Sequence, residues 1–143
     1  MDKEVFDIKK ELEVLGDFTT ISSVPQPVPY VYGKTVVELM KRDERIVCLC
    51  ADVQWPTEND YIRKHFPERY YQMGIAEANM IGVASGMAKT GDIVFAHTFA
   101  VFASRRAFDQ IAMQIAYPKA KVLIMGFLPG IATNLGVSHQ SIE

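Results

Sequence analysis

The chain has 143 residues, of which 49% are hydrophobic, so it is long enough to bury one core and shows no sign of a second domain. Its formal net charge of −2 provides no electrostatic attraction to nucleic acid or to an anionic membrane, and we expect neither as a partner. The longest apolar runs are too short to cross a bilayer and the acidic start lacks the regions of a signal peptide, so we expect a cytoplasmic protein.

The first 29 residues read as an appendage to the domain that follows them. An apolar stripe with helical spacing runs from Val5 to Leu15, and residues 17–29 contain three prolines, which are typical of an extended linker. The sequence therefore predicts a short N-terminal helix and a linker over residues 1–29, followed by one domain over residues 30–143.

Beyond residue 30, helix and strand patterns alternate along the chain. Helices are predicted over residues 33–41, over 57–65 with Thr57 as the cap, from Glu77 onward, and over 102–115. Strands are predicted over residues 46–50, 70–73, 93–96 and 121–125, the last entering a glycine-bearing loop at 126–136. Such alternation forms a parallel sheet that binds ligands at the carboxyl ends of its strands. We therefore predict an α/β fold of three layers, α/β/α, around a mostly parallel sheet.

Two cysteines alternate along the first predicted strand. Cys48 and Cys50 point to the same face, and two residues this close in an extended strand cannot easily form a disulfide or supply a full metal site. We expect buried free thiols.

One carboxylate stands at the entrance of a helix that is rich in small residues. Glu77 follows a short aromatic strand and precedes Gly82, Ala84, Ser85, Gly86 and Ala88, a surface that suits close helix packing across a subunit interface. A carboxylate in this setting either stabilises its own helix through the N-terminal dipole or is held to act on a proton. The local pattern alone favours the capping role.

Four segments together carry a family resemblance. The stretch from Phe66 to Met80, the sequence A-H-T-F-A-V-F at 96–102, R-A-F-D-Q at 106–110 and S-H-Q at 138–140 closely resemble the pyrimidine-binding domain of transketolases, particularly the C-terminal subunit of split transketolases. The match runs from about Tyr32 to the end of the chain with its motifs in the expected order. The resemblance implies the thiamine-diphosphate-binding fold, and thiamine diphosphate as the cofactor.

The resemblance also implies roles for residues at the carboxyl ends of the strands. Glu77 would hydrogen-bond a ring nitrogen of the cofactor's aminopyrimidine and favour the tautomer that can take the thiazolium proton. Phe99 and Phe102 match the aromatic pocket that stacks the pyrimidine, and Asp52, after the first strand, joins the cofactor-binding group. As an alternative, the spacing of the two phenylalanines suits two core residues on one helical face, which the spacing alone favours.

Three histidines differ in what the sequence says of them. His139 matches the histidine that lies near the reacting carbon and the substrate hydroxyls in transketolases, which implies a catalytic and substrate-binding role. His97, at a strand end, is a second candidate for substrate binding, with a satisfied structural histidine as the alternative. His65, at the end of a polar helix, is expected to be a solvated cation with no chemical role.

Departures from the family pattern fall on the substrate side. Pro29 stands where transketolases usually carry an arginine, Phe127 where they carry a histidine, and Leu135 where they carry an acid, whereas the residues expected to face the cofactor match. Arg105, Arg106 and Lys34 could supply a different anion site, but exposed basic residues on helices are mostly solvated.

The sequence also lacks half of a cofactor site. Nothing in it resembles the Gly-Asp-Gly and asparagine motif that holds magnesium and diphosphate in this superfamily, or a Gly-x-x-x-x-Gly-Lys loop. We therefore expect Mg²⁺ and the diphosphate to be held by a partner, a diphosphate-binding transketolase subunit, in a homo- or hetero-oligomer. The family continues past the position of Glu143, so we also expect a domain truncated at its C-terminal end.

The implied activity is transfer of a two-carbon ketol unit between sugar-like substrates. Two alternatives remain open. One is another thiamine-diphosphate reaction, of the deoxyxylulose-phosphate synthase or pyruvate dehydrogenase beta type. The other is a non-catalytic domain that keeps the subunit interface.

Overall fold

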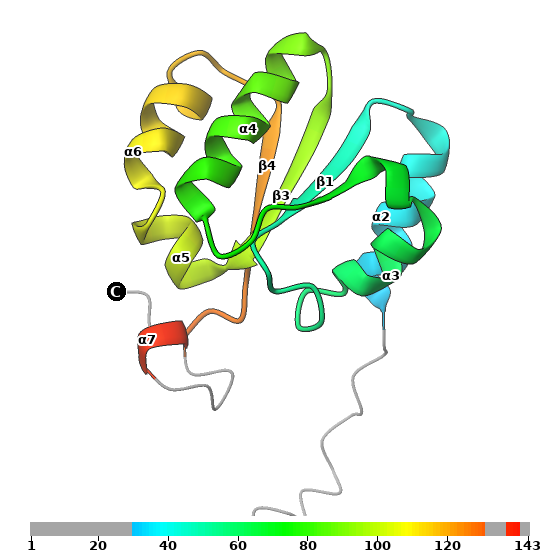
Figure 1. Cartoon of the computed structure of the whole chain (residues 1–143), viewed down its shortest axis with the longest axis horizontal. Coiled ribbons are helices and arrows are strands. Elements are labelled where there is room, and N and C mark those ends of the chain that lie inside the picture. Colours follow the sequence, from blue (N-terminus) through cyan, green and yellow to red (C-terminus); the bar gives the residue numbers. More distant parts are fainter. Residues whose placement is uncertain (1–29, 131–136, 141–143) are drawn as a thin grey trace, which may run out of the picture.

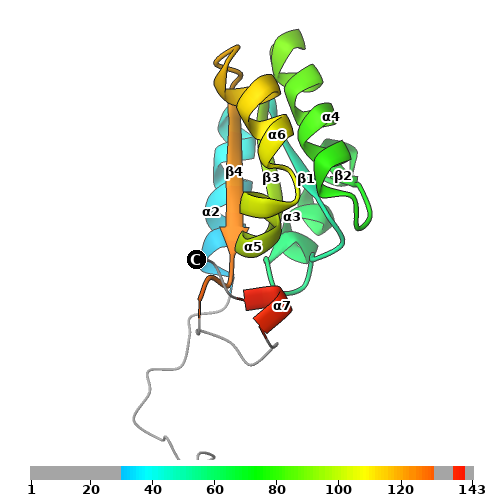
Figure 2. The same cartoon turned by 90° about the vertical axis from the view of Figure 1, so that its left-hand side faces the viewer.

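The computed structural model describes residues 30–130 and 137–140 of the chain. The helix and linker expected over residues 1–29, together with Pro29 and Leu135, lie outside these residues. Four strands form one parallel sheet in the order β2-β1-β3-β4 (Figures 1 and 2). Their bounds are β1 Ile46–Cys50, β2 Tyr70–Gln72, β3 Ile93–Phe99 and β4 Val122–Phe127. The predicted α/β fold around a parallel sheet is confirmed.

Helices cover both faces of this sheet. On one face lie α2 (Val31–Arg42) and α3 (Asn59–His65), and on the other lie α4 (Glu77–Thr90), α5 (Ala100–Arg105), α6 (Phe108–Gln110) and the π-helical segment η3 (Ile111–Ala116). Figures 1 and 2 show the two helical layers with the sheet between them. Two shorter elements complete the described chain, the 3₁₀ turn η2 (Pro67–Arg69) before β2 and α7 (Val137–Gln140) below the sheet.

The central strand β1 is buried along its whole length, as its continuous apolar sequence predicts. Successive side chains point to opposite faces, so Val47 and Leu49 pack in the core under α4 while Cys48 and Cys50 pack in the core under α2. Both cysteines are free and buried, as expected, and burial raises the pKa of the Cys48 thiol to about 12.

The register of the sheet brings the strand ends to one edge. Cys50 lies beside His97, and Phe99 lies beside Phe127. The segments that follow β1, β2 and β3 therefore start close together in space, although they are far apart in the sequence. This shared carboxyl edge is the part of the fold that positions the candidate site.

The predicted cap of α3 is wrong. The helix begins at Asn59 with Glu58 at the cap position, and the Thr57 hydroxyl instead donates to the Val53 carbonyl at 2.6 Å. The side-chain Nδ2 of Asn59 in turn donates to the Thr57 hydroxyl oxygen at 2.7 Å, so the threonine is buried inside its own turn. The Glu58 carboxylate is used elsewhere, since it accepts a hydrogen bond of 2.7 Å from the Gly33 amide near the start of α2.

The helix predicted over residues 102–115 is also wrong in its continuity. Strand β3 runs on to Phe99, and the chain then divides into α5, α6 and η3, because Ala107 leaves the helical conformation with φ −117° and ψ 17°. Phe99 therefore ends a strand while Phe102 lies in a helix, so the alternative that places both on one helical face does not hold.

The small residues of α4 serve packing inside the chain. Ala84 and Ser85 are buried, the Ser85 hydroxyl donates to the Gln114 carbonyl at 2.6 Å, and a Cβ added at Gly82 would lie 3.3 Å from the Gln114 side chain. Gly86 is exposed, with open space where a Cβ would stand. Packing of this helix across a subunit interface stays a prediction.

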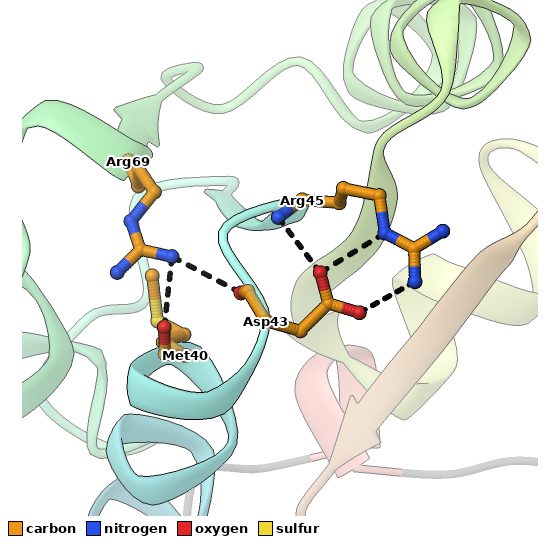
Figure 3. Close-up of polar contacts among 4 residues, drawn as sticks. All are labelled: Met40, Asp43, Arg45 and Arg69. Atoms are coloured by element: carbon orange, nitrogen blue, oxygen red, sulfur yellow. Dashed lines mark hydrogen bonds and ion pairs between the residues drawn. The ribbon is translucent and has the colours of Figure 1, made fainter.

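An arginine joins the edge strand to the end of α2 (Figure 3). Arg69 Nη1 donates to the carbonyls of Met40 and Asp43, at 3.0 and 3.2 Å, and so supplies a donor to carbonyls at the helix end; the Asp43 carbonyl also accepts from the Ile46 amide at 3.3 Å. Its guanidinium also lies 4.1 Å from the centroid of the Phe66 ring. Beside it, hydrogen bonds from Arg45 hold the pKa of the Asp43 carboxyl at about 2.

Replacing this arginine should weaken the attachment of β2. Arg69→Ala is expected to lower the free energy of unfolding by about 1–3 kcal/mol, because two hydrogen bonds from a charged donor are lost. The measurement is urea denaturation. Arg45→Ala is the comparison variant, since that side chain pairs with Asp43 at the surface, where solvent screening limits the loss, and we expect a smaller decrease. Equal effects of the two variants would contradict the assignment.

Candidate functional site

A cavity of about 400 Å³ opens at the carboxyl edge of the sheet. We call it the carboxyl-edge cavity, and its lining comes from segments that follow β1, β2 and β3 and from α7. The lining residues are Ala51, Asp52, Val53, Pro56, Ile75, Glu77, Phe99, Phe102, Arg106 and His139. Five of the six predicted site residues therefore meet here, and His97 does not line the cavity.

Glu77 places a buried carboxylate in the wall of this cavity. It is the first residue of α4 and is only 4% exposed. Arg106 Nη1 donates to both carboxylate oxygens, at 3.1 Å to Oε1 and 3.3 Å to Oε2. The charge of the carboxylate is thus met by a guanidinium, and by the positive end of the helix dipole. Arg106, which we expected to be solvated, is instead half exposed and paired.

Two phenylalanines form an aromatic wall beside the carboxylate. The ring centroids of Phe99 and Phe102 are 6.0 Å apart, and both residues are buried together with Val101. The guanidinium of Arg106 lies over the Phe102 ring, with Cζ 3.6 Å from its centroid. The arginine therefore bridges the aromatic wall and the carboxylate.

His139 covers the aromatic wall from α7. Its ring meets Phe102 and Phe99 edge-on, with centroid distances of 5.1 and 6.2 Å. The residue is exposed, and its Nδ1 lies 2.8 Å from the Ser138 hydroxyl. An imidazole at the mouth of a cavity, with one nitrogen paired and the ring open to solvent, is suited to exchange protons with a ligand.

Asp52 lines the cavity from the loop after β1, and a hydrogen bond to Gln72 fixes the position of this loop. Asp52 is exposed and has a left-handed backbone, with φ 58°. The Gln72 side-chain oxygen accepts hydrogen bonds from the amides of Asp52 and Gly74, at 2.9 and 3.1 Å. Gln72 thus fixes the loop after β1 to the loop that leads into Glu77. We did not predict this role; the signal available was a polar residue at the end of β2.

His97 lies within strand β3 and does not line the cavity. It is fully buried, with Nδ1 2.9 Å from the Leu49 carbonyl and Nε2 2.8 Å from the Tyr32 hydroxyl. A carbonyl can only accept, so Nδ1 carries the hydrogen and Nε2 accepts from the tyrosine. This geometry is that of a satisfied structural histidine, and it does not support the predicted contact with substrate.

Phe127 packs against the rings of Tyr32 and His97. Its ring centroid lies 5.1 Å from that of Tyr32 and 6.2 Å from that of His97. The position where the resemblance leads us to expect a histidine is therefore filled by an apolar ring in contact with other rings. His65, for its part, is exposed and pairs with the Tyr61 carbonyl at 2.9 Å, so it has no place in the site.

Across residues 30–130 and 137–140, no group of three His, Cys, Asp or Glu side chains is arranged to hold a metal ion. None of the helices in these ranges combines the length and the apolar character needed to cross a bilayer.

Known proteins share this sequence and fold. The family model of the transketolase pyrimidine-binding domain matches residues 27–143. A protein of Methanocaldococcus jannaschii named for the C-terminal section of transketolase is 47% identical over 113 residues, which are 78% of this chain and 36% of that protein. A 1-deoxy-D-xylulose-5-phosphate synthase of Parabacteroides distasonis is 32% identical over 82% of this chain and 18% of its own.

Among solved structures, a split gene transketolase described as an inactive beta4 tetramer is similar, with a TM-score of 0.65 and 48% identity. The alignment covers 76% of this chain and 35% of that one. The chain thus spans about a third of the length of the Methanocaldococcus jannaschii protein and of the solved split transketolase.

The buried histidine makes stability depend on pH. Burial lowers the pKa of His97 to about 4, so between the ordinary value of 6.5 and about 4 the unfolded chain binds a proton that the folded chain does not. The free energy of unfolding should therefore fall as the pH drops through this window, by about 3 kcal/mol in total.

Urea denaturation at pH 7 and pH 4.5 measures this fall. His97→Gln should reduce the difference between the two pH values, whereas His65→Gln, at an exposed histidine, should leave it unchanged. If His97→Gln retained the full difference, another group would have to be responsible.

Proposed function

The chain belongs to the transketolase family as a pyrimidine-binding domain, and we propose that it activates thiamine diphosphate for transfer of a two-carbon ketol unit between sugar-like substrates. The observation that carries this proposal is the buried Glu77 carboxylate beside the Phe99–Phe102 wall in the carboxyl-edge cavity. A carboxylate that is desolvated and open to a cavity is suited to proton chemistry on a ring nitrogen.

The residues of this cavity fit one half of the cofactor. A volume of about 400 Å³ accommodates an aminopyrimidine ring, the aromatic wall offers stacking, and Glu77 offers a hydrogen-bond acceptor. No group of metal ligands is found among the described residues, so they provide nothing comparable for a magnesium-bound diphosphate. We therefore assign the ring to this chain, and Mg²⁺ and the diphosphate to a partner subunit.

Thiamine diphosphate supplies the reactive carbon when it is bound. Glu77 would hold or release a proton at its carboxylate oxygen, opposite the ring nitrogen. The buried faces of Phe99 and Phe102 would keep water from that hydrogen bond, which strengthens it. His139, exposed at the mouth, would move protons at the substrate, and Asp52 would line the cofactor's entry.

Similarity to a split transketolase supports a two-subunit enzyme. The similar solved structure, 48% identical to this chain, is described as a beta4 tetramer of a split gene transketolase. We propose a diphosphate-binding transketolase subunit as the partner, with the active site formed where the two chains meet.

A second reaction has support from one comparison. The 1-deoxy-D-xylulose-5-phosphate synthase match extends over 82% of the chain, so a pyruvate donor is the rival to a ketose donor. Assays of the complex copurified from the native source, with xylulose phosphate or pyruvate as the donor, distinguish the two.

The catalytic assignment of Glu77 can be tested in that complex. Glu77→Gln should lower turnover at least roughly a hundredfold, the scale of lost general acid–base catalysis, because an amide cannot exchange the proton. Glu44→Gln removes an equal charge from an exposed position and should leave turnover unchanged. Circular dichroism of both variants checks the fold. Near-normal turnover of Glu77→Gln would remove the catalytic role and leave only a structural carboxylate.

A further inference from the structure

Arg106 makes both of the contacts that the proposed function assigns to the cofactor's ring. Its Nη1 lies within 3.3 Å of both oxygens of the Glu77 carboxylate, and its Cζ lies 3.6 Å from the centroid of Phe102. The acceptor and the aromatic face proposed for the aminopyrimidine are therefore occupied by a side chain of the same chain.

The guanidinium resembles the ring in its chemistry. It is planar, it donates hydrogen bonds in its plane to a carboxylate, and it stacks on aromatic faces. An aminopyrimidine is likewise planar, carries in-plane nitrogen groups that hydrogen-bond a carboxylate, and stacks on aromatic rings. From this match we infer that Arg106 is an intramolecular competitor that fills the ring site until the cofactor displaces it. The inference rests on the proposed function of the cavity.

Arg106 can leave the site, whereas Glu77 cannot. The arginine side chain is 46% exposed and that of Glu77 is 4% exposed. Arg106 is the cap residue at the end of α5, just before Ala107 leaves the helical conformation, so its side chain can turn toward solvent without disturbing the core of the sheet. Glu77 is held in the first turn of α4 by the packing of Met80 and Ile81 behind it.

Replacement of the ring by Arg106 gives the buried Glu77 carboxylate a hydrogen-bond donor when no ring is bound. A buried carboxylate without a partner is unfavourable, so the site needs a replacement donor whenever the ring is absent. Arg106 supplies that donor, and as a consequence every ring that binds must first break the Glu77–Arg106 pair. Ring affinity is therefore lower than the contacts alone would give, which makes binding depend on the additional contacts that a partner subunit makes to the diphosphate.

The test is an NMR titration of the full chain with 4-amino-2-methylpyrimidine, the ring without the diphosphate. Shifts of the amides around Glu77 and Phe102 report binding at the cavity. Arg106→Ala should lower the dissociation constant by on the order of tenfold, the combined weight of a half-exposed ion pair and a cation–π contact. Arg106→Lys keeps the charge but lacks the planar guanidinium, so its dissociation constant should lie between those of the parent chain and of Arg106→Ala.

Arg105→Ala is the matched control, because it removes the same charge one residue earlier from a side chain that does not line the cavity. Its dissociation constant should equal that of the parent chain. In the parent chain, the Nε–H signal of Arg106 should also move toward the position of a solvated arginine as the ring is added.

The outcomes separate this inference from the proposed function. If the ring binds the parent chain at the cavity and Arg106→Ala binds it equally well or more weakly, the competitor role of the arginine is wrong, while the ring site stands. If the ring shifts no cavity amide in any well-folded variant, both the competitor and the ring site are wrong.

Discussion

The need to pair one buried carboxylate governs the arrangement of this site. Glu77 is taken out of water at the first turn of α4, and a carboxylate in that position must have its charge met by a donor. The donor, Arg106, comes from the end of α5, 29 residues away in the sequence. That contact also brings the guanidinium over Phe102 and so sets the aromatic wall against the carboxylate.

Parallel strand register makes this contact possible. Strands β1, β2 and β3 run in the same direction, so their carboxyl ends lie at one edge of the sheet. The loop of Asp52, the start of α4 and the end of β3 therefore lie close together. Gln72 then fixes two of these loops to each other through its side-chain oxygen. The parallel topology therefore brings the walls of the cavity together, and the residue types at the strand ends determine its polarity.

The sequence predicted well the features that depend on local pattern. The strand over residues 46–50 has its observed bounds, because a short run of apolar residues in a parallel sheet is buried on both faces. The cap at Thr57 and the unbroken helix over residues 102–115 were wrong, because a turn hydrogen bond and the backbone at Ala107 overrode local propensity.

Pairwise contacts across the fold were beyond prediction. The pairing of Arg106 with Glu77 and the enclosure of His97 between Tyr32 and Leu49 join residues 29 to 65 positions apart, and no periodicity encodes them. The sequence motifs therefore predicted most of the residues that meet at the carboxyl-edge cavity. The ion pair and hydrogen bonds that these residues form could be seen only in the structure.

We propose that two chains divide the cofactor between them, with the ring on this chain and the diphosphate on a partner. A buried carboxylate and an aromatic wall line the cavity that we propose for the ring, and across residues 30–130 and 137–140 no group of three His, Cys, Asp or Glu side chains is arranged to hold a metal ion. Calorimetric titration of the isolated chain with thiamine diphosphate and Mg²⁺ tests this most directly. We expect no micromolar binding, with or without the metal, until the partner subunit is added. Micromolar binding by the isolated chain with Mg²⁺ would contradict it, because a diphosphate site would then lie on this chain.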